Sequence, residues 1–581
     1  MEYLIFAIVA VGFVVIIMIF GWFREQAEQR KFIGRLRTDY GILPRREYIA
    51  EQYGNIACYY RSHQTGIVID DITWNDLEMD ELFRRMNYTY SSAGEEYLYY
   101  LLRSPATDKG ELDRREAIIT YFQENEDPRV AWQFLMAKLG RTGKYSIYNY
   151  LDYLDELGTR NNLRHYLSII AFFVAIAAFF GSVTIGITLL FGVLSYNLMT
   201  YFKIKKEIDP YITSFSYIFR LLHCIRDMEK HPIPILKEEL AEMIRCKNAF
   251  RKFRRGSSLL MSPSRMNASG NPLELLMDYL RMGFHLDLIK FNQMLSEVNR
   301  HKAAIDRILT VAGSIEALIA IGAWRAGLAR KGQGFAIPEF TVEQAVMTQN
   351  IVASGLYHPF LTDPVKNNLR VNRSILLTGS NASGKSTFLK TVALNAILAQ
   401  TIHTCTASSY KTGFFHIATS MSLRDDILKG DSYYMAEIKS MKRLTDMAKE
   451  ARFPVLILVD EVLRGTNTVE RIAASTQILR NLGGKNRLCF AATHDIELTY
   501  LLEKEYDNYH FEEEFREGDI YFPYLLKNGR ATTRNAIKLL RVMGYDERLV
   551  TDAERLAERF LVSGRWEDKT GNISKVSKDA T

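Results

Sequence analysis

The sequence predicts a largely helical N-terminal half that carries apolar membrane elements, followed by a C-terminal α/β domain with a mostly parallel sheet. Two long uncharged runs, residues 4–23 and 166–202, are apolar enough for a bilayer. The residues around the second run have helical periodicity. From Ile337 onward, short apolar runs alternate with helical stretches, which is the βα pattern of a parallel sheet.

Length and composition fit several folded domains in a reducing compartment. The 581 residues suggest three or four domains, and 48% hydrophobic with 24% charged residues is typical of globular chains. The 74 basic and 67 acidic residues give a net charge of +7, an excess too small over this length to indicate a nucleic-acid-binding protein by itself. Five cysteines lie far apart without a Cys-x-x-Cys pair, which excludes a disulfide scaffold and a cysteine-rich zinc module.

The first apolar run predicts an uncleaved transmembrane anchor. It is long enough to cross a bilayer, no basic residue precedes it, and no small-x-small cleavage site follows, which argues against a signal peptide. The positive-inside rule then places the N-terminus outside and the rest of the chain in the cytoplasm of a multi-pass cell-membrane protein. The basic residues that follow the run at once are Arg24, Arg30, Lys31, Arg35 and Arg37.

The second apolar run predicts a transmembrane helical hairpin. One straight helix over residues 166–202 would reach roughly 55 Å, too long for the bilayer core. Two helices over 166–180 and 185–202, with a turn near Gly181 and Ser182, leave both basic flanks on the cytoplasmic side. A shallow re-entrant hairpin and a buried soluble hairpin are the alternatives.

Helical periodicity over residues 77–157 is interrupted at Ser104-Pro105 and at Asp127-Pro128, and the pattern changes after a linker at residues 332–334. Residues 282–328 predict one long helix or two helices packed end to end. Residues 245–255 hold six basic residues and no acid, which fits a solvated helix face, contact with anionic lipid, or contact with nucleic acid equally well. The predicted segments are an anchor (1–23), a juxtamembrane linker (24–80), a helical core in two parts (81–160 and 203–331) around the hairpin (166–202), the α/β domain (337–562) and a disordered tail (563–581).

A phosphate-binding loop follows a short apolar strand at residues 374–378. The loop sequence GSNASGKST is GxxxxGK[ST] in its strand–loop–helix setting. Glycines let the backbone N–H groups point at phosphates, the helix N-terminus adds partial positive charge, the lysine adds a full charge, and the serine hydroxyl reaches Mg²⁺. The predicted nucleotide-binding residues are Gly379, Ser380, Asn381, Ala382, Ser383, Gly384, Lys385, Ser386 and Thr387.

A second buried strand, residues 455–459, ends in the two carboxylates that hydrolysis needs. Asp460 is predicted to hold Mg²⁺ together with Ser386, and Glu461 is predicted to polarise the attacking water as general base. Further on, His494 follows another apolar strand, where it can sense the γ-phosphate. The sequence therefore predicts an α/β P-loop ATPase that uses ATP and Mg²⁺.

These motifs resemble the ATPase domain of the MutS mismatch-repair family. The resemblance rests on GSNASGKST, then KGDSYYMAE at residues 429–437, VDEVLRGTNT and ATHDIELT. It extends to Tyr357-His358-Pro359-Phe360, to Asn368, and to a C-terminal segment similar to the family's helix-turn-helix dimerisation element. More weakly, residues 81–122 are similar to the start of the MutS helical core.

The resemblance implies an ABC-type MutS ATPase domain preceded by an all-α, MutS-core-like domain. Ser432 looks like the family's signature serine, which reaches the nucleotide of the partner subunit, so the resemblance implies a homodimer with two composite sites. Lys385 and Ser386 would serve phosphate and Mg²⁺, Asp460 and Glu461 hydrolysis, and His494 the γ-phosphate switch.

The chain also departs from the family pattern. It shows no N-terminal mismatch-reading domain with a Phe-x-Glu wedge, a membrane hairpin interrupts its helical core, and its loop reads Asn-Ala-Ser-Gly where Asn-Met-Gly-Gly is usual. The leading expectation is a membrane-anchored ATPase that acts on mismatched or branched DNA or on a DNA-bound protein partner. A membrane ATPase scaffold without DNA binding is the second expectation. A transporter subunit is disfavoured because no LSGGQ-like signature occurs.

Overall fold

The computed structural model divides the chain into two compact units. Unit 1 comprises Met1–Gly66, Phe83–Ser104 and Gly110–Gly332, and unit 2 comprises Ile67–Leu82, Pro105–Lys109 and Gln333–Thr581. The residues that the structure describes are 2–142, 146–158, 160–230, 232–254, 280–341, 350–380, 382–421, 433–451, 453–516, 519–531, 536–563 and 566.

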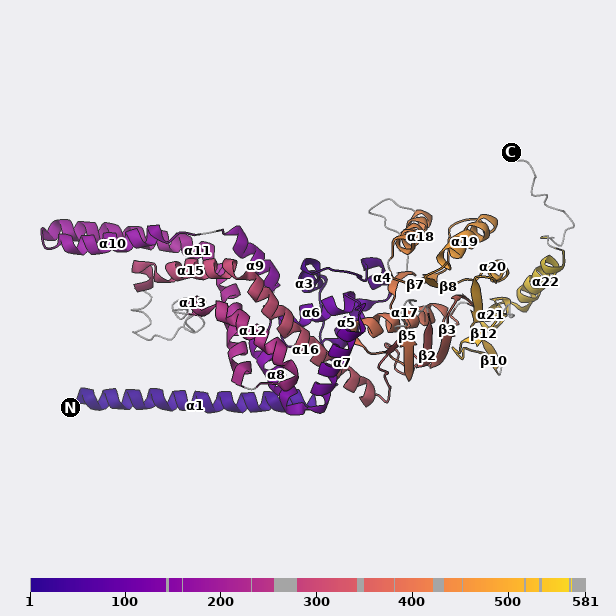
Figure 1. Cartoon of the computed structure of the whole chain (residues 1–581), viewed down its shortest axis with the longest axis horizontal. Helices are drawn as coiled ribbons and strands as arrows, with labels where there is room; N and C mark the ends of the chain where they lie inside the picture. Colours follow the sequence, from indigo (N-terminus) through magenta and orange to yellow (C-terminus); the bar gives the residue numbers. More distant parts are fainter. Residues whose placement is uncertain are drawn as a thin grey trace, which may run out of the picture. The chain divides into compact units, whose positions relative to one another are not determined.

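Unit 1 is helical throughout its described part (Figure 1). Helix α5 (Met79–Met86) crosses the boundary between the units. The other helices are α1 (Glu2–Thr38), α2 (Ala50–Ile56), α3 (Cys58–Ser62), α6 (Ser92–Arg103), α7 (Lys109–Glu124), α8 (Glu126–Leu139), α9 (Ile147–Glu156), α10 (Leu163–Ala178), α11 (Val183–Lys230), η1 (Pro234–Leu236), α12 (Lys237–Ala249), α13 (Arg251–Arg254), α15 (Leu286–Arg300) and α16 (Lys302–Arg330).

One helical break differs from the sequence prediction. Pro128 lies in the first turn of α8, where a proline needs no backbone N–H, so the break falls at Asn125 instead. Residues 282–328, read as one helix or two, form two, because α15 ends at Arg300 and α16 begins at Lys302. The expected break at Ser104 and Pro105 is present.

Helices α10 and α11 form an antiparallel hairpin whose turn lies at residues 179–182, where the sequence placed it. Helix α11 runs for 48 residues, far beyond the expected end at 202, and contains Pro210. The N-terminal half of α11 is mostly exposed, with Phe191 74% exposed, whereas Phe215 and Ile218 of the C-terminal half are buried in unit 1. The N-terminal half of α11 is thus exposed, whereas its C-terminal half belongs to the core of unit 1.

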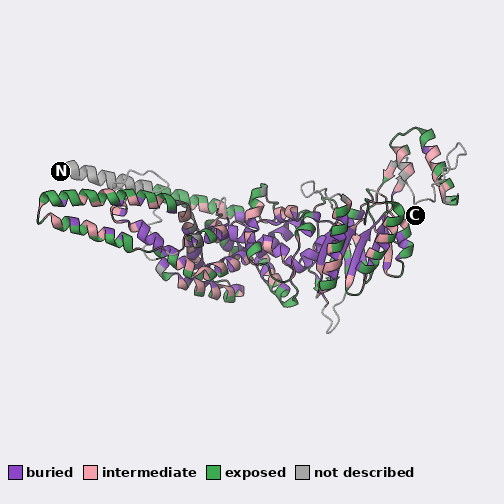
Figure 2. Cartoon of the chain, turned by 90° about the horizontal axis from the view of Figure 1, so that it is seen from above, coloured by how far each residue is buried: buried purple, intermediate pink, exposed green. Residues whose placement is uncertain are grey.

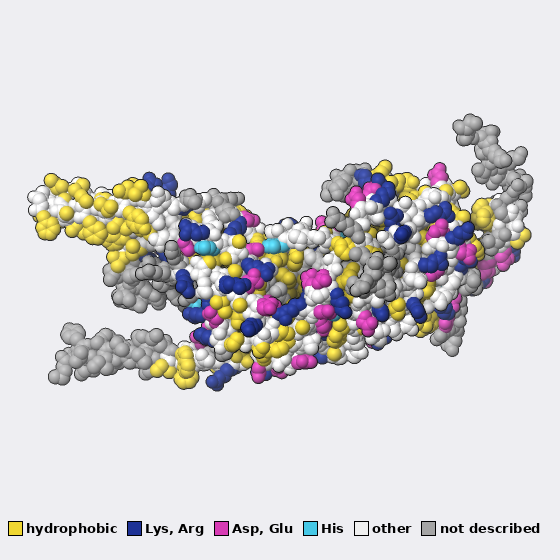
Figure 3. Space-filling view, viewed as in Figure 1, with side chains coloured by type: hydrophobic (Ala, Val, Ile, Leu, Met, Phe, Trp, Pro, Cys, Tyr) yellow, Lys and Arg dark blue, Asp and Glu magenta, His cyan; other side chains and the backbone are white. Residues whose placement is uncertain are grey.

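The hairpin presents apolar side chains to its surroundings (Figures 2 and 3). Among the described residues, one helical segment, Val183–Ile208, is long and apolar enough to cross a membrane, and only 11% of its apolar window is buried. Helix α10 is apolar but shorter, at 16 residues. Its low burial distinguishes this hairpin from the core helices of soluble proteins.

Two ion pairs connect the C-terminal end of α1 to α8. Arg37 donates to Glu126 at 2.7 Å and to Asp127 at 2.5 Å. Helix α1 is 37 residues long and therefore extends well beyond this contact. In Figures 1 and 2, α1 and the α10–α11 hairpin leave the same end of unit 1.

The core of unit 1 is built around α16, which packs closely against α6. At Gly313 a side-chain carbon would lie 2.5 Å from the carbonyl oxygen of Ala93, so only glycine permits this approach. Two buried charges are satisfied within the core. Arg325 makes two hydrogen bonds to Glu116, at 2.6 and 2.7 Å, and Glu316 accepts hydrogen bonds from the backbone N–H of Tyr90 and the hydroxyl of Ser91.

Unit 2 is an α/β domain with two main sheets. A six-stranded sheet has the order β12-β9-β4-β8-β7-β6, in which all strands but β12 are parallel, and a four-stranded sheet has the order β1-β5-β2-β3. The strands are β1 (Glu339–Phe340), β2 (Ile351–Leu356), β3 (Asn367–Val371), β4 (Ser374–Thr378), β5 (Ser409–Thr412), β6 (His416–Ser420), β7 (Val455–Asp460), β8 (Arg487–Ala492), β9 (Tyr506–His510), β10 (Glu514–Arg516), β11 (Asp519–Tyr521) and β12 (Lys527–Asn528).

Helices cover both faces of the six-stranded sheet. Helices α18, α19 and α20 share one apolar core with its central strands. Helix α17 packs against β6, β7 and β8 and is almost wholly buried. The helices of unit 2 are α4 (Asp71–Asp76), α17 (Lys385–Ile402), α18 (Tyr433–Glu450), α19 (Thr468–Leu482), α20 (Ile496–Leu501), α21 (Ala536–Val542) and α22 (Glu547–Ser563). The βα alternation expected from Ile337 onward is confirmed.

Residues 24–80, expected to be a linker, hold the end of α1 and three short helices, of which α4 belongs to unit 2. The hydroxyl of Thr419 donates to the Asp76 carboxylate at 2.7 Å, and the backbone N–H of Met421 donates to the same oxygen at 2.9 Å. Asp76 is only 4% exposed. An early segment of the chain therefore completes the edge of the sheet beside β6.

Candidate functional site

The phosphate-binding loop lies between β4 and α17, as the sequence predicted. Strand β4 is buried at every position, and α17 begins at Lys385 directly after the loop. Three loop residues adopt left-handed or related backbone conformations: Gly379 (φ +147°), Ala382 (φ +65°) and Gly384 (φ +103°). Such positive φ values curl a chain so that successive N–H groups can face one anion.

Lys385 is held over this loop. Its ammonium donates to the carbonyl oxygens of Gly379 at 2.8 Å and Ser380 at 2.9 Å, and lies 3.4 Å from Nε2 of His494. The residue is 5% exposed. Burial lowers the pKa of the Lys385 ammonium, and the nearby carboxylates of Glu461 and Asp460 oppose that shift. A buried cation at this position attracts a multiply charged anion strongly.

Asp460 and Glu461 stand where β7 ends. The backbone N–H of Glu461 donates to the carbonyl of Ala492 on the neighbouring strand at 3.0 Å, and Glu461 has a φ of +64°. Such a conformation in a residue with a side chain is strained by about 1–3 kcal/mol and is frequent at functional sites. The chain thus leaves the extended conformation of β7 at Glu461.

Two cationic or proton-donating groups hold the Glu461 carboxylate. His494 Nε2 lies 3.0 Å from one of its oxygens, and Arg464 Nε lies 2.6 Å from the other. Burial alone would raise the pKa of Glu461, but His494, Arg464 and Lys385 together lower that pKa below its ordinary value. Glu461 is therefore ionised at neutral pH, as a general base must be.

Two supporting contacts position the partners of Glu461. The carboxylate of Glu437, 3% exposed on α18, accepts hydrogen bonds from the backbone N–H groups of Arg464 and Gly465 at 3.1 and 3.3 Å. Arg471 on α19 makes two hydrogen bonds to Asp495, at 2.6 and 3.0 Å, directly after His494. The sequence alone indicates neither the role of Glu437 nor the pairing of Arg471 with Asp495, because the partners lie 24 to 28 residues apart.

These residues line one cavity of about 680 Å³. Its lining includes Ser380, Ala382, Gly384, Lys385, Ser386, Thr387, Asp460, Glu461, Arg464 and His494. The volume falls in the usual range for small-molecule sites. The structure thus brings together the predicted phosphate, metal and general-base residues.

The opposite wall of the cavity comes from the four-stranded sheet and the segment after β11. Tyr357, His358, Asn367 and Tyr524 are among its residues. The side-chain amide of Asn367 donates to the Tyr524 carbonyl at 3.0 Å, and its oxygen accepts from the Leu526 N–H at 2.7 Å. This asparagine therefore fixes the segment that carries the Tyr524 ring beside Gly384.

Asn368, which the resemblance singled out, has a different role here. Its side-chain oxygen accepts from the N–H of Gly355 at 2.9 Å and from the hydroxyl of Ser354 at 3.2 Å. Because neighbouring residues of a strand point to opposite faces, Asn367 rather than Asn368 lines the cavity. Ser432 and Asn381 lie outside the described residues.

The site fits a nucleoside triphosphate with a divalent cation. Ser383 is 2% exposed, and its buried hydroxyl has no hydrogen-bond partner among the described residues, so this polar atom is available to a ligand. Ser386 and Asp460 offer oxygen ligands of the type that Mg²⁺ prefers. The described residues contain no cluster of three or more His, Cys, Asp or Glu side chains that could hold a metal unaided.

Comparison with known families agrees with this geometry. Residues 375–561 match the model of MutS domain V. The α/β domain is similar to MutS domain V. The matched region contains the loop, both carboxylates and His494, together with α21 and all but the last two residues of α22.

Individual relatives of this domain carry MutS or DNA mismatch repair names. The DNA mismatch repair protein MutS of Persephonella marina is 33% identical over 216 residues, which cover 35% of this chain and 24% of that protein. MutS protein homolog 4 of Homo sapiens is 28% identical over 49% of this chain and 31% of its own length. The DNA mismatch repair protein MSH3 of Meyerozyma guilliermondii is 26% identical over 46% and 29%. The chain thus matches about a quarter to a third of the length of these relatives.

Proposed function

We propose that this chain is a membrane-anchored ATPase of the MutS type that works as a homodimer and couples ATP hydrolysis to surveillance of mismatched or branched DNA. One observation carries the proposal. Lys385, Asp460, Glu461 and His494 converge on one cavity of about 680 Å³ whose floor is a phosphate-binding loop. The names of the relatives, DNA mismatch repair proteins among them, support the DNA part of the proposal.

Each residue has a distinct part in hydrolysis. Lys385 and the loop N–H groups bind the β- and γ-phosphates. Glu461 orients and polarises the water that attacks the γ-phosphorus, and His494 stands between that carboxylate and Lys385. Ser386 and Asp460 would hold Mg²⁺, which supplies charge neutralisation on the phosphate oxygens.

Two variants separate binding from hydrolysis. Lys385→Ala should weaken ATP binding, because the buried charge at the phosphates is lost. Glu461→Gln should leave ATP bound and lower the hydrolysis rate by about a hundredfold or more, since only the water-activating group is removed. Nucleotide binding and phosphate release are measured on the purified full chain. Equal loss of binding in both variants would contradict the assigned roles.

We further propose that the chain is a multi-pass protein of the cell membrane with its ATPase domain in the cytoplasm. The apolar segment Val183–Ile208 is 11% buried over its apolar window and supports this placement. Helix α10 pairs with it, and the basic residues after Phe23 support a cytoplasmic location for unit 2. Membrane lipid would then be a constant partner.

A membrane ATPase scaffold without DNA binding is the second candidate, and one contact favours it. In the basic segment 245–255, Lys247 forms an ion pair with Glu229 and is 6% exposed, so this charge is not available to phosphates. A salt titration of binding to duplex and branched DNA distinguishes the two candidates. A steep fall of affinity with salt indicates phosphate contacts, and absence of binding at low salt would favour the scaffold. An unidentified protein partner fits either candidate.

A further inference from the structure

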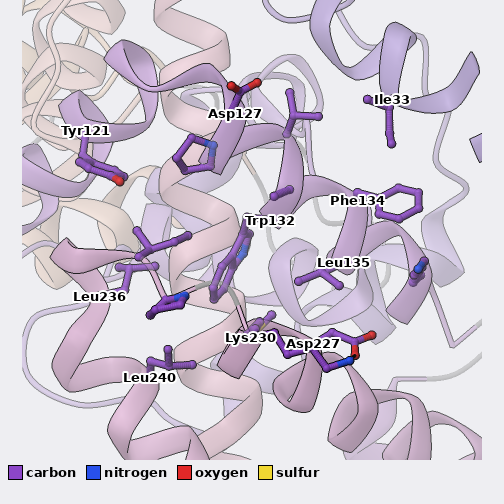
Figure 4. Close-up of a pocket in the computed structure, with 17 residues that line it drawn as sticks. Ile33, Tyr121, Asp127, Trp132, Phe134, Leu135, Asp227, Lys230, Leu236 and Leu240 are labelled. Atoms are coloured by element: carbon purple, nitrogen blue, oxygen red, sulfur yellow. Dashed lines mark hydrogen bonds and ion pairs between the residues drawn. The ribbon is translucent and has the colours of Figure 1, made fainter. Parts of the chain in front are cut away.

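A second cavity, of about 730 Å³, lies within unit 1 and is not used by the proposed ATPase chemistry (Figure 4). Its walls come from α1, α7, α8, the C-terminal end of α11, η1 and α12. Most of its lining is apolar, and several of these side chains are only half-buried. The apolar lining residues used below are Ile33, Trp132, Phe134, Leu135, Leu236 and Leu240.

The floor of this cavity is held in place by polar contacts. Arg114 donates to the carbonyl oxygen of Ile235 at 2.7 Å and to Glu239 at 2.6 Å, which fixes η1 and α12. The thiol of Cys224 donates to the carbonyl oxygen of Leu135 at 3.4 Å, which links α11 to α8. The cavity is therefore part of the folded framework, and a site with fixed walls favours a ligand of defined shape.

One lining residue carries an unsatisfied donor. Trp132 is 3% exposed, and its buried indole N–H has no hydrogen-bond partner among the residues that the structure describes. Figure 4 shows Trp132 between Leu236 and Leu135. A buried donor left unpaired is unfavourable and is uncommon in folded proteins. A ligand with a hydrogen-bond acceptor would satisfy this group.

The charged groups of the lining are paired, with one exception. Asp127 accepts a hydrogen bond from Arg37 at 2.5 Å, and Asp227 accepts one from Lys230 at 3.2 Å. The ammonium of Lys138 lies 4.4 Å from the Phe134 ring centroid, and no described residue forms an ion pair with it. The cavity therefore combines hydrocarbon walls with one exposed positive charge that has no anionic partner.

We propose that this cavity binds a single-chain anionic amphiphile of the fatty-acid type. The apolar walls would bury the hydrocarbon chain, and each buried methylene stabilises such a complex. Lys138 would pair with the head group, and the indole N–H of Trp132 would donate to an oxygen acceptor. A neutral molecule would leave the Lys138 charge without a partner.

The position of Ile33 favours a free amphiphile over a lipid that stays in the bilayer. Ile33 follows Phe23, the last residue of the apolar run, by ten positions, or ~15 Å along a helix. Under the proposed membrane topology, the cavity lies on the cytoplasmic side of the hydrocarbon core. Only this step of the proposal depends on that topology. A chain must leave the bilayer to enter it, which a single-chain molecule does far more readily than a two-chain lipid.

The test uses the full chain, purified in a nonionic steroid-based detergent that has neither an alkyl chain nor an anionic head group to compete. A sixteen-carbon fatty acid with a photoreactive diazirine is crosslinked, and the labelled peptides are mapped. Labels are expected within residues 126–139 and 232–240, and unlabelled palmitate should remove them. Labels confined to 4–23 and 163–208 would overturn the proposal, since they would report only the apolar surface of the membrane helices.

Three variants sharpen the test. Lys138→Gln should weaken binding about fivefold, because a charge-assisted contact is lost, while the matched control Lys331→Gln at the end of α16 should not. Trp132→Phe should also weaken binding but should not lower the unfolding temperature of the ligand-free protein, because it removes an unpaired donor. Leu135→Trp should abolish labelling by filling the cavity.

Competitors distinguish the sources of the ligand. The palmitate methyl ester should compete several-fold less well than palmitate, because it lacks the anionic head. A two-chain anionic phospholipid should compete weakly. Equal competition by the ester, strong competition by the phospholipid, or full binding by the Lys138→Gln variant would each overturn the proposal. None of these outcomes depends on ATP, so failure here is distinct from failure of the proposed ATPase.

Discussion

Glu461 is held by residues from two separate segments, and this arrangement sets its protonation. Arg464 and His494 each contact one carboxylate oxygen, and both lower its pKa against the opposing effect of burial. Removing either group therefore changes the pH at which the general base becomes ionised. Such an effect can be measured separately from nucleotide binding.

Arg464→Ala should move the acidic limb of the hydrolysis rate to higher pH. Without the guanidinium the pKa of Glu461 rises, and because the carboxylate is the active form, activity is lost first on the acidic side. The rate at saturating ATP is measured from about pH 4 to about pH 9, so that the range includes the ordinary pKa of a glutamate. Arg480→Ala is the control, because Arg480 pairs with Glu505 on the surface of the same domain. An unchanged acidic limb would contradict the proposed effect of Arg464.

Site residues that the sequence predicts belong to local motifs, whereas those that it does not predict contact residues far away in the sequence. The loop around Lys385 is a local motif, so its sequence was sufficient to locate it. Glu437 was missed because its role is to accept from N–H groups 27 and 28 residues away. Asn367 and Asn368 are adjacent in a strand, and only the strand's register decides which one faces the cavity.

At the scale of elements, the pairing of α16 with α6 buries a carboxyl group. Glu316 is 1% exposed, and burial raises its pKa to about 7, although hydrogen bonds from Ser91 and Tyr90 oppose that shift. The unfolded chain would titrate this group near 4.5. The folded protein therefore binds more protons than the unfolded chain between these values, so stability falls as pH rises from about 4.5 through about 7.

Glu316→Gln should remove this pH dependence. The wild type should lose up to roughly 3 kcal/mol relative to the variant between pH 4.5 and pH 8. Unfolding temperatures of the two full-length proteins are compared across this range. Glu111→Gln, on the exposed part of α7, serves as control. A constant difference between wild type and Glu316→Gln at all pH values would show that the carboxyl does not titrate in this window.

The helical elements were predicted better than their ends. The turn at residues 179–182 was located because glycine, serine and the charge flanks mark it locally. The continuation of α11 to Lys230 was not, because its second half is stabilised by packing of residues such as Phe215 and Leu221 inside unit 1. Helix α4 joins unit 2 through the contact of Asp76 with Thr419, 343 residues away, which no local pattern indicates.

At the scale of the whole molecule, the membrane proposal predicts how the protein fractionates. It should stay with membranes through high-salt and alkaline extraction, because apolar burial rather than charge would hold it. A chain lacking residues 1–23 should remain partly bound through the α10–α11 hairpin. The fractions are followed by immunoblotting. Complete release of the intact chain by salt would contradict a spanning anchor.

A homodimer with composite sites predicts complementation between inactive chains. Ser432→Ala should bind ATP without hydrolysing it, and Lys385→Ala should fail to bind. Mixed, the two variants should regain hydrolysis at one of two sites, because that site holds an intact Lys385 from one chain and an intact Ser432 from the other. ATPase activity is measured on solubilised mixtures with demonstrated heterodimers. Absence of recovery would argue against a Ser432 that acts across the interface.

Pro210 gives α11 a consequence for how the chain would sit in a bilayer. The segment Val183–Ile208 has 26 residues and is thus ~39 Å long, which exceeds a hydrocarbon core of roughly 30 Å. It must lean away from the bilayer normal or protrude beyond the hydrocarbon. Pro210 follows two residues later and lacks the N–H that would bond to the carbonyl of Lys206. If the membrane became thinner or thicker, the segment Val183–Ile208 would therefore change its tilt by bending near Pro210. The buried C-terminal half of α11 would keep its packing.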